Sequence, residues 1–194
     1  MSAGDPVDGI RIVGTPQGGF GAQALAEIDA IFFEASATKS FASQASRAVF
    51  RERWLGRHLV HFPACTFLAR DRAGTILGYV IGALDDPAHD PRFADIPYFR
   101  DFAHLTARYP AHLHINLAPA ARNRGIGGRL VDAFCAHAAA QGKPGVHVVT
   151  SETSRNRSFY ARQRFSLDLI RLASRTTKPA ICSFRLSTSD GFTP

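Results

Sequence analysis

A turn rich in glycine and arginine joins two apolar stretches within residues 116–134, and its composition suits the binding of an anion. Gly125, Gly127 and Gly128 lack the Cβ atoms that keep a ligand away from backbone amides. Three arginines at positions 122, 124 and 129 add positive charge beside them. When such a turn opens a helix, the free amides and the helix dipole attract phosphate. The alternative is a glycine-rich turn that allows a helix to pack tightly on a strand.

The turn does not match two other phosphate loops. The stretch GIGGRL has Leu130 where a dinucleotide-binding fold needs its third glycine, and no Gly-Lys-Ser/Thr follows as in a Walker loop. Cys65, Cys135 and Cys182 lie far apart without metal-ligand spacing, so we expect no metal site and no structural disulfide. The net charge of +7 suits nucleic acid or a small anion. Arginines cluster at the starts of two predicted helices, which resembles two sides of one site and favours the small anion.

Hydrophobic periodicity predicts the elements of the first half. The second helix is expected to bury Val49, Phe50, Trp54 and Leu55 before Pro63 ends it. A connection as long as residues 85–110 is uncommon unless it is functional. In order, the pattern predicts a strand at 9–16, a helix at 20–36, a helix after Ser40, a hairpin at 65–84 turning at 71–74, and a short helix near 97–108.

The second half is more regular and defines the fold class. One apolar stripe runs along residues 126–138, which fits a helix packed on a sheet. Together the halves predict an α/β fold with one mixed sheet and helices on both faces. The sequence predicts a strand at 112–118, a helix at 125–141, a strand at 145–151, a helix at 154–163, and strands at 165–172 and 180–186.

The order of these pieces resembles a known family. Arg122-x-x-Gly125-x-Gly127, preceded by INLAP and followed downstream by SFYARQRF, is similar to the GCN5-related N-acetyltransferases (GNAT), whose pyrophosphate loop reads Arg/Gln-x-x-Gly-x-Gly/Ala. The resemblance implies a GNAT-like, mostly antiparallel central sheet with a splayed strand pair. Within the family, HLHINL with the preceding ARYP resembles the acetyltransferase-like domains associated with O-GlcNAc hydrolases. We expect a flexible N-terminus at 1–8, a single domain at 9–187 and a C-terminal tail at 188–194.

The resemblance implies acetyl-CoA as the cosubstrate. The loop amides would hold its pyrophosphate, and its pantetheine arm would lie between the strand ending at 115–117 and the strand beginning near Val146. The sequence departs from the family pattern at Thr153, at Asn156 in place of alanine, and at Arg164 in place of glycine. The implied cofactor-binding residues are Ile115, Asn116, Leu117, Arg122, Asn123, Arg124, Gly125, Ile126, Gly127, Gly128, Thr153, Asn156 and Arg157.

Tyr160 stands where the family has its tyrosine. A phenol near the thioester can protonate the departing thiolate, so the resemblance implies that Tyr160 is the general acid. The alternative is a packing residue beside Phe159. The backbone N–H of Leu117 is the implied oxyanion partner, since preorganised amides stabilise developing charge.

The general base has several candidates. His112 and His114 are two residues apart on a predicted strand, so they share one face with Asn116. An imidazole can take a proton from an ammonium near neutral pH, although local hydrogen bonds would equally account for both histidines. Asp86, with Asp85, follows the hairpin and is the other candidate, with a solvated turn as its alternative reading.

We therefore predict an acetyl-CoA-dependent N-acetyltransferase in which an amine attacks directly in a ternary complex. The acceptor is expected between residues 33–41 and 85–110, where acidic side chains suit a cationic amine or only decorate a loop. The first alternative is a non-catalytic acyl-CoA-binding domain, and a basic nucleic-acid-binding module ranks below it. With no signal peptide and no membrane-length apolar stretch, we expect a cytoplasmic monomer or homodimer without membrane or nucleic-acid partners.

Overall fold

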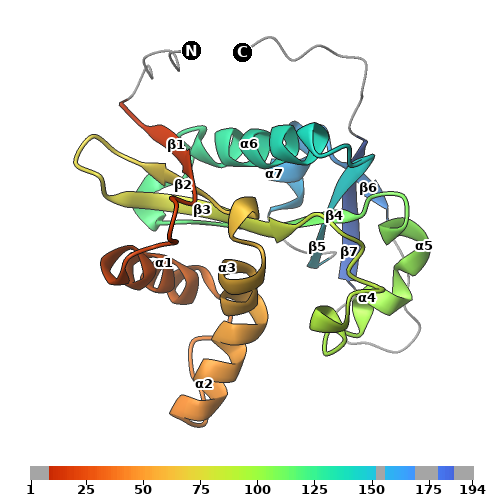
Figure 1. Cartoon of the computed structure of the whole chain (residues 1–194), viewed down its shortest axis with the longest axis horizontal. Coiled ribbons are helices and arrows are strands. Elements are labelled where there is room, and N and C mark those ends of the chain that lie inside the picture. Colours follow the sequence, from red (N-terminus) through yellow and green to blue (C-terminus); the bar gives the residue numbers. More distant parts are fainter. Residues whose placement is uncertain (1–8, 152–155, 169–178, 186–194) are drawn as a thin grey trace. The chain divides into compact units, whose positions relative to one another are not determined.

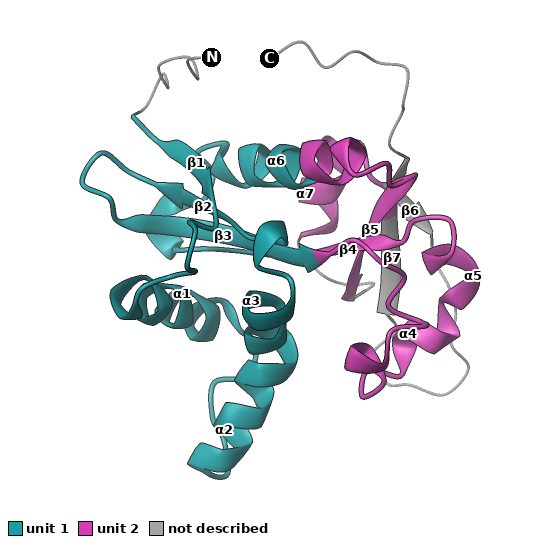
Figure 2. Ribbon diagram, in the orientation of Figure 1, with its two compact units in different colours: residues 1–82, 114–134 teal, residues 83–113, 135–194 magenta. Residues whose placement is uncertain are grey.

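A computed structural model describes residues 9–151, 156–168 and 179–185, and Figure 1 shows its helices and strands along the chain. The chain forms two compact units, coloured separately in Figure 2. Unit 1 consists of Met1–Gly82 and His114–Phe134, and unit 2 of Ala83–Leu113 and Cys135–Pro194. Strand β4 (Ala111–Leu117) is continuous but divided, because residues 111–113 belong to unit 2 and residues 114–117 to unit 1. Helix α6 (Ile126–Ala140) is divided after Phe134 in the same way.

The strands of unit 1 follow the order β1-β2-β3-β4. β1 (Arg11–Gly14) pairs antiparallel with β2 (Phe67–Arg70), and β2 pairs antiparallel with β3 (Ile76–Ala83). The predicted hairpin is confirmed. Its turn closes with the Gly74 N–H donating to the Asp71 carbonyl over 3.1 Å, and Gly74 has a φ of +88° that favours glycine.

Helices α1 (Ala22–Ala35), α2 (Gln44–Arg51) and α3 (Arg57–His61) make up the predicted first two helices, with a π-helical turn at Glu52–Gly56 between α2 and α3. Ser43 begins α2 with a reciprocal cap, in which Ser43 and Ser46 each accept from the other's backbone N–H. In unit 1, α1 and α3 cover one face of the strands (Figure 2). Ile28, Ile31, Phe32, Leu55, Leu68, Ile76, Tyr79 and Ile81 form the core there.

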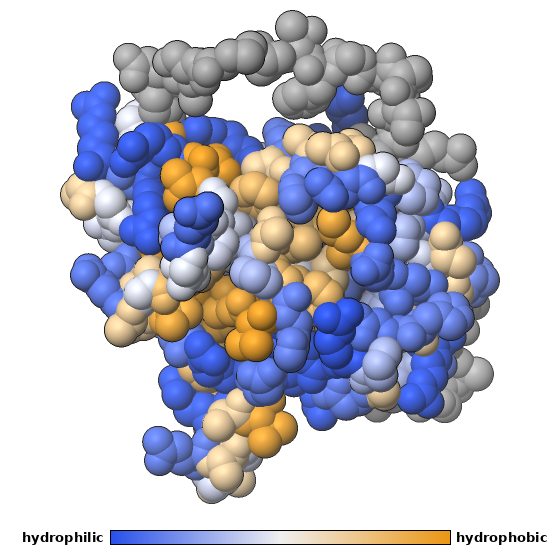
Figure 3. Space-filling model, viewed as in Figure 1, coloured by the Kyte–Doolittle hydropathy of each residue, from blue (hydrophilic) through white to orange (hydrophobic). Residues whose placement is uncertain are grey.

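One predicted core position is wrong. Val49 is 61% exposed, and hydrophobic colour reaches the surface over α2 in Figure 3. The reason is that α2 buries none of its residues and packs mainly through the half-buried Phe50. Leu55 lies in the core as predicted, and Trp54 packs against it while half-buried.

The strands of unit 2 follow the order β4-β5-β7-β6, where β4 is parallel to β5 and the other pairs are antiparallel. Ala111 of β4 pairs with Val146, and His112 pairs with His147. The connection at 85–110 contains two short α-helices at the predicted place, preceded by a 3-10 turn at Pro91–Phe93. The remaining elements are α4 (Tyr98–Asp101), α5 (Ala103–Thr106), β5 (Gly145–Ser151), α7 (Arg157–Arg162), β6 (Ser166–Asp168) and β7 (Pro179–Arg185).

The predicted fold class, a mixed and mostly antiparallel α/β sheet with helices on both faces, is confirmed. The predicted N-terminus at 1–8, tail at 188–194 and contacts of Thr153 lie outside the described residues, and the single domain at 9–187 stays a prediction. Within the described ranges, none of the helices has both the length and the hydropathy that crossing a membrane requires.

Candidate active site

The turn after β4 has an unusual backbone. A 3-10 turn at Pro119–Ala121 leads into it, and α6 begins directly after it at Ile126. Asn123 and Gly125 have φ values of 60° and 75°, in the left-handed region. Left-handed residues that alternate with ordinary ones make a concave row of N–H groups, a geometry that binds anions. The N-terminus of a helix of 15 residues at the same place adds its dipole.

The turn also offers charge and space. Arg122, Asn123, Arg124 and Gly125 are exposed, and a Cβ atom built on Gly125 would meet no other atom within 4 Å. The Arg122 guanidinium lies 3.4 Å from the carbonyl oxygen at the end of β4. The third arginine is used elsewhere, because Arg129 Nη2 donates to the Ile10 carbonyl over 2.8 Å. Two exposed arginines and an open backbone therefore suit an anionic group at this turn.

The end of β4 is held close to β3 in unit 1. The Ala118 N–H donates to the Leu77 carbonyl over 2.9 Å. A Cβ atom on Gly78 would come within 2.8 Å of the Asn116 carbonyl oxygen and would overlap Leu117 Cδ2. Glycine at position 78 therefore allows the two backbones to approach at Asn116 and Leu117.

His114 lies between two aromatic rings of unit 1. Its ring centroid is 5.9 Å from that of Trp54 and 5.3 Å from that of His58, and both pairs are nearly perpendicular. Trp54 belongs to the π-helical turn, and His58 belongs to α3. His114 itself is half-buried. Its imidazole is therefore oriented by neighbours without being sealed from solvent.

His58 differs from His114 because it is fully buried, with 0% exposure. Burial, and then the positive charges of His114 and Arg57, hold the pKa of His58 well below its ordinary value. His58 therefore stays neutral near pH 7. Of these two histidines, His114 is the one that solvent can reach.

His112 lies in a different environment in unit 2. It is 2% exposed, and its ring packs on Phe93 and Phe99 at centroid distances of 4.8 and 5.2 Å. The His147 ring is 5.7 Å away, and His147 Nδ1 donates to the Tyr109 carbonyl over 2.5 Å. Burial lowers the pKa of His147 to about 4, against smaller raising effects from that hydrogen bond and from Asp86. The structure thus separates the two candidate bases on β4 into one accessible and one enclosed imidazole.

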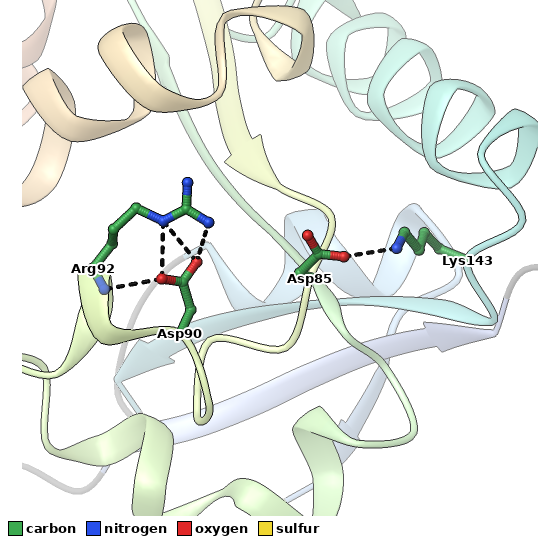
Figure 4. A network of polar contacts seen from close by, with 4 residues as sticks. All are labelled: Asp85, Asp90, Arg92 and Lys143. Carbon is green, nitrogen blue, oxygen red and sulfur yellow. Dashed lines mark hydrogen bonds and ion pairs between the residues drawn. The ribbon is translucent and has the colours of Figure 1, made fainter.

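The carboxylates of the connection at 85–110 have partners within unit 2. Asp85 pairs with Lys143 over 2.8 Å, and Asp90 binds two guanidinium nitrogens and the backbone N–H of Arg92 (Figure 4). Asp86 accepts from the Ala88 N–H over 2.9 Å and lies 3.0 Å from His89 Nδ1. Burial raises the pKa of Asp86, but hydrogen bonds from Thr106, Ala88 and His89 outweigh it and the net shift is downward. A carboxylate of lowered pKa is a weak base.

The last predicted site residues lie on α7 in unit 2. Tyr160 is 3% exposed, and its ring packs on Phe159 and Phe165. The Thr150 hydroxyl donates to Asn156 Oδ1 over 2.7 Å, and Arg157, half-buried, begins the helix. Arg164, just after α7, has a φ of 61°. The backbone at this position is left-handed, a conformation that favours glycine, and this explains why the family pattern has glycine here.

The predicted site residues are divided between the units. Unit 1 holds His114, Ile115, Asn116, Leu117 and the residues of the turn, while unit 2 holds Asp86, His112, Asn156, Arg157 and Tyr160. The sequence pattern did not single out Trp54 and His58, whose rings lie beside His114. The spacing of Trp54 and His58, four residues apart in a helix, was the available signal. Among the described side chains, no group of three or more His, Cys, Asp or Glu is arranged to hold a metal ion.

Comparisons with solved structures agree with this fold. The structure of SsHAT matches with a TM-score of 0.70 and 21% identity over 91% of this chain and 98% of that one. A phosphinothricin acetyltransferase from Sinorhizobium meliloti, solved in complex with AcCoA, matches at 0.57 and 18% identity, covering 96% and 93%. The protein yncA from Salmonella typhimurium, solved with its cofactor acetyl-CoA, matches at 0.55 and 14% identity, covering 96% and 98%.

A family model matches the chain itself. The model of the acetyltransferase (GNAT) family covers residues 22–165, which include the turn after β4, His114 and Tyr160. With most of its length matched, the chain belongs to the acetyltransferase (GNAT) family.

Proposed function

We propose that the protein transfers the acetyl group of acetyl-CoA to an amine. The observation that carries this proposal is the turn at 122–128, with left-handed Asn123 and Gly125, two exposed arginines and the start of α6. This combination suits a pyrophosphate, and two structural neighbours were solved with acetyl-CoA. The residues expected to contact acetyl-CoA are those named from the sequence, with Thr153 outside the described residues.

His114 is the proposed general base. In the transfer, a C–N bond forms and the C–S bond breaks as the amine attacks the thioester. The proton lost by the nitrogen goes to His114, which is accessible and lies beside a neutral His58. His112 is less suited because Phe93 and Phe99 enclose it, and Asp86 is less suited because its pKa is lowered.

Tyr160 is the proposed proton donor to the departing thiolate, and the Leu117 N–H is the proposed partner of the carbonyl oxygen. The family resemblance of SFYARQRF supports the role of Tyr160. Its 3% exposure and its packing on Phe159 and Phe165 favour a second candidate function, a non-catalytic acyl-CoA-binding domain. Free-thiol release with a panel of amines separates the two, since binding without release on any amine supports the second.

The binding step has a direct test with a matched control. Gly125→Trp fills the open space beside the turn, whereas Gly74→Trp changes another left-handed glycine with equally open surroundings in the hairpin. Isothermal calorimetry with acetyl-CoA should give micromolar affinity that weakens with salt for the wild type and Gly74→Trp, and a loss of at least about 100-fold for Gly125→Trp. Equal affinities in both variants would contradict the site. Binding of duplex DNA without any response to acetyl-CoA would support the nucleic-acid alternative.

The finer resemblance to domains associated with O-GlcNAc hydrolases stays a prediction.

A further inference from the structure

Tyr79 carries a polar group into the core of unit 1. Its side chain is 0% exposed on β3 and packs in the cluster that includes Ile28, Phe32 and Leu55. Burial raises the pKa of the Tyr79 phenol, so the hydroxyl stays neutral at any working pH. A buried hydroxyl requires a hydrogen-bond partner, and here Asn116 Nδ2 donates to Tyr79 Oη over 2.8 Å.

This hydrogen bond occupies the Nδ2 end of the Asn116 amide. Asn116 is half-buried on β4, two residues after His114, so the two side chains lie on the same face of the strand. Because Nδ2 points to Tyr79, the amide oxygen Oδ1 points the other way and keeps its capacity to accept. The close approach at Gly78 fixes the backbone that carries this amide.

We propose that Tyr79 is a positioning residue that presents the Asn116 amide oxygen to the attacking nitrogen, so that Asn116 and His114 together select primary amines. The inference rests on the proposed function. A primary amine has two N–H bonds, one to donate to Asn116 Oδ1 and one whose proton passes to His114. A secondary amine has one N–H and an alcohol has one O–H, so either can serve Asn116 Oδ1 or His114, but not both. The Asn116 oxygen would then lack the hydrogen bond that a primary amine supplies, and this loss gives the pair its selectivity.

The kinetic test uses Tyr79→Phe with Tyr109→Phe as the matched control, because the hydrogen bond of Tyr109 uses its backbone carbonyl. The probes are spermidine, tyramine and lysine amide, each compared with its N-methylated secondary amine, with thiol release as the readout. Tyr79→Phe should lower kcat/KM for the best primary amine by about 5- to 30-fold, as expected for one hydrogen bond. It should also narrow the preference for primary amines and leave the acetyl-CoA Kd within about twofold of wild type.

A second measurement separates positioning from general damage. In Asn116→Ala, the further change Tyr79→Phe should cost nothing more, since Tyr79 acts through Asn116. In a ¹H–¹⁵N spectrum, one Asn116 side-chain amide proton should be protected from solvent exchange in the wild type and lose this protection in Tyr79→Phe.

The outcomes that overturn the inference are distinct from failure of the proposed function. Turnover of primary amines that Tyr79→Phe leaves unchanged, equal rates for secondary amines, or an undiminished effect of Tyr79→Phe in Asn116→Ala each contradict the role of Tyr79. Acetyl-CoA binding without thiol release on any amine contradicts the proposed function and, with it, this role.

Discussion

Two pairs of histidines occur in the two units of the molecule, and they differ in exposure rather than in spacing. In unit 1, His58 and His114 have ring centroids 5.3 Å apart, and in unit 2, His112 and His147 are 5.7 Å apart. The unit 1 pair combines a buried ring with a half-buried one, whereas both rings of the unit 2 pair are buried. Two positions apart on β4, His114 and His112 thus have opposite access to solvent.

This difference shows that the neighbours of an imidazole, and not its place on the strand, decide whether it is accessible for proton transfer. Phe93 and Phe99 enclose His112, and desolvation favours the neutral form of His147 beside it. His114 has Trp54 and a neutral His58 beside it and remains accessible. We therefore expect the unit 1 pair to serve the reaction and the unit 2 pair to serve stability.

The largest expected effect separates the two positions of β4. His114→Gln removes the proposed base and should lower kcat by about 10²- to 10⁴-fold, with the acetyl-CoA Kd little changed. His112→Gln should instead reduce the free energy of unfolding by about 1–3 kcal/mol, because a buried amide replaces a fitted ring, while kcat per folded molecule stays near wild type. Steady-state thiol release and urea denaturation measure the two quantities. A folded His112→Gln protein without activity would reverse the assignment.

The next effect concerns acid. Unfolded histidine has a pKa near 6.5, and the folded pKa of His147 is about 4, so the unfolded state binds the proton first. Above about pH 6.5, His147 is neutral in both states and its titration does not reduce the free energy of unfolding. As the pH drops toward 4, protonation of the unfolded state lowers the free energy of unfolding by on the order of 3 kcal/mol. The charge of Asp86 opposes the shift, and the ring of the buried His112 lies beside His147.

Urea denaturation at several pH values, in the wild type and in His147→Asn, checks this prediction. The asparagine amide can still donate to the Tyr109 carbonyl but does not titrate. The stability difference between the two proteins should therefore shrink as the pH falls from 7 to 4. Parallel curves over that interval would show that His147 does not titrate between folded and unfolded states as expected.

The smallest of these effects compares the aromatic neighbours of the two pairs. Trp54→Phe weakens the edge contact on His114 and should lower kcat by about 2- to 12-fold, the range expected from one aromatic pair. Phe99→Leu loosens the enclosure of His112 and should cost about 1 kcal/mol of stability with kcat unchanged. Measuring kcat and the urea midpoint for both variants tests whether the unit 1 pair serves the reaction and the unit 2 pair serves stability. An activity loss in Phe99→Leu as large as that in Trp54→Phe would argue against it.

The sequence predicted the order of elements because local patterns carry that information. The strand at β4, the glycine turn and α6 were all found from apolar periodicity and glycine placement. The predicted burial of Val49 was wrong because periodicity shows which residues share a helix face, and not whether another element covers that face. The π-helical turn at Glu52–Gly56 was also absent from the prediction, since its extra residue per turn leaves no compositional mark.

The candidate site was harder to predict for a related reason. Of the predicted turn residues, Arg122 to Gly125 are exposed, whereas Ile126 and Gly127 are buried, and their role in binding acetyl-CoA stays a prediction. The environments of His112 and His114 depend on Phe93, Phe99 and Trp54, which are distant along the chain. Alternation on a strand could not distinguish the two histidines, because it gives them the same face. The link between Tyr79 and Asn116 likewise joins residues whose pairing no local pattern records.

Arg164 offers a means of engineering a more heat-resistant protein. An arginine with a φ of 61° is strained by its Cβ atom, and Arg164→Gly removes that strain at an exposed position after α7. The greater freedom of glycine in the unfolded chain offsets part of the gain, so we expect a net stabilisation of about 0.5–1 kcal/mol and a higher Tm. Arg162→Gly, within α7, should instead destabilise by about 1 kcal/mol. If both variants lower the Tm measured by calorimetry, then contacts of the Arg164 side chain outweigh its backbone strain, and the position is best left unchanged in a stabilised enzyme.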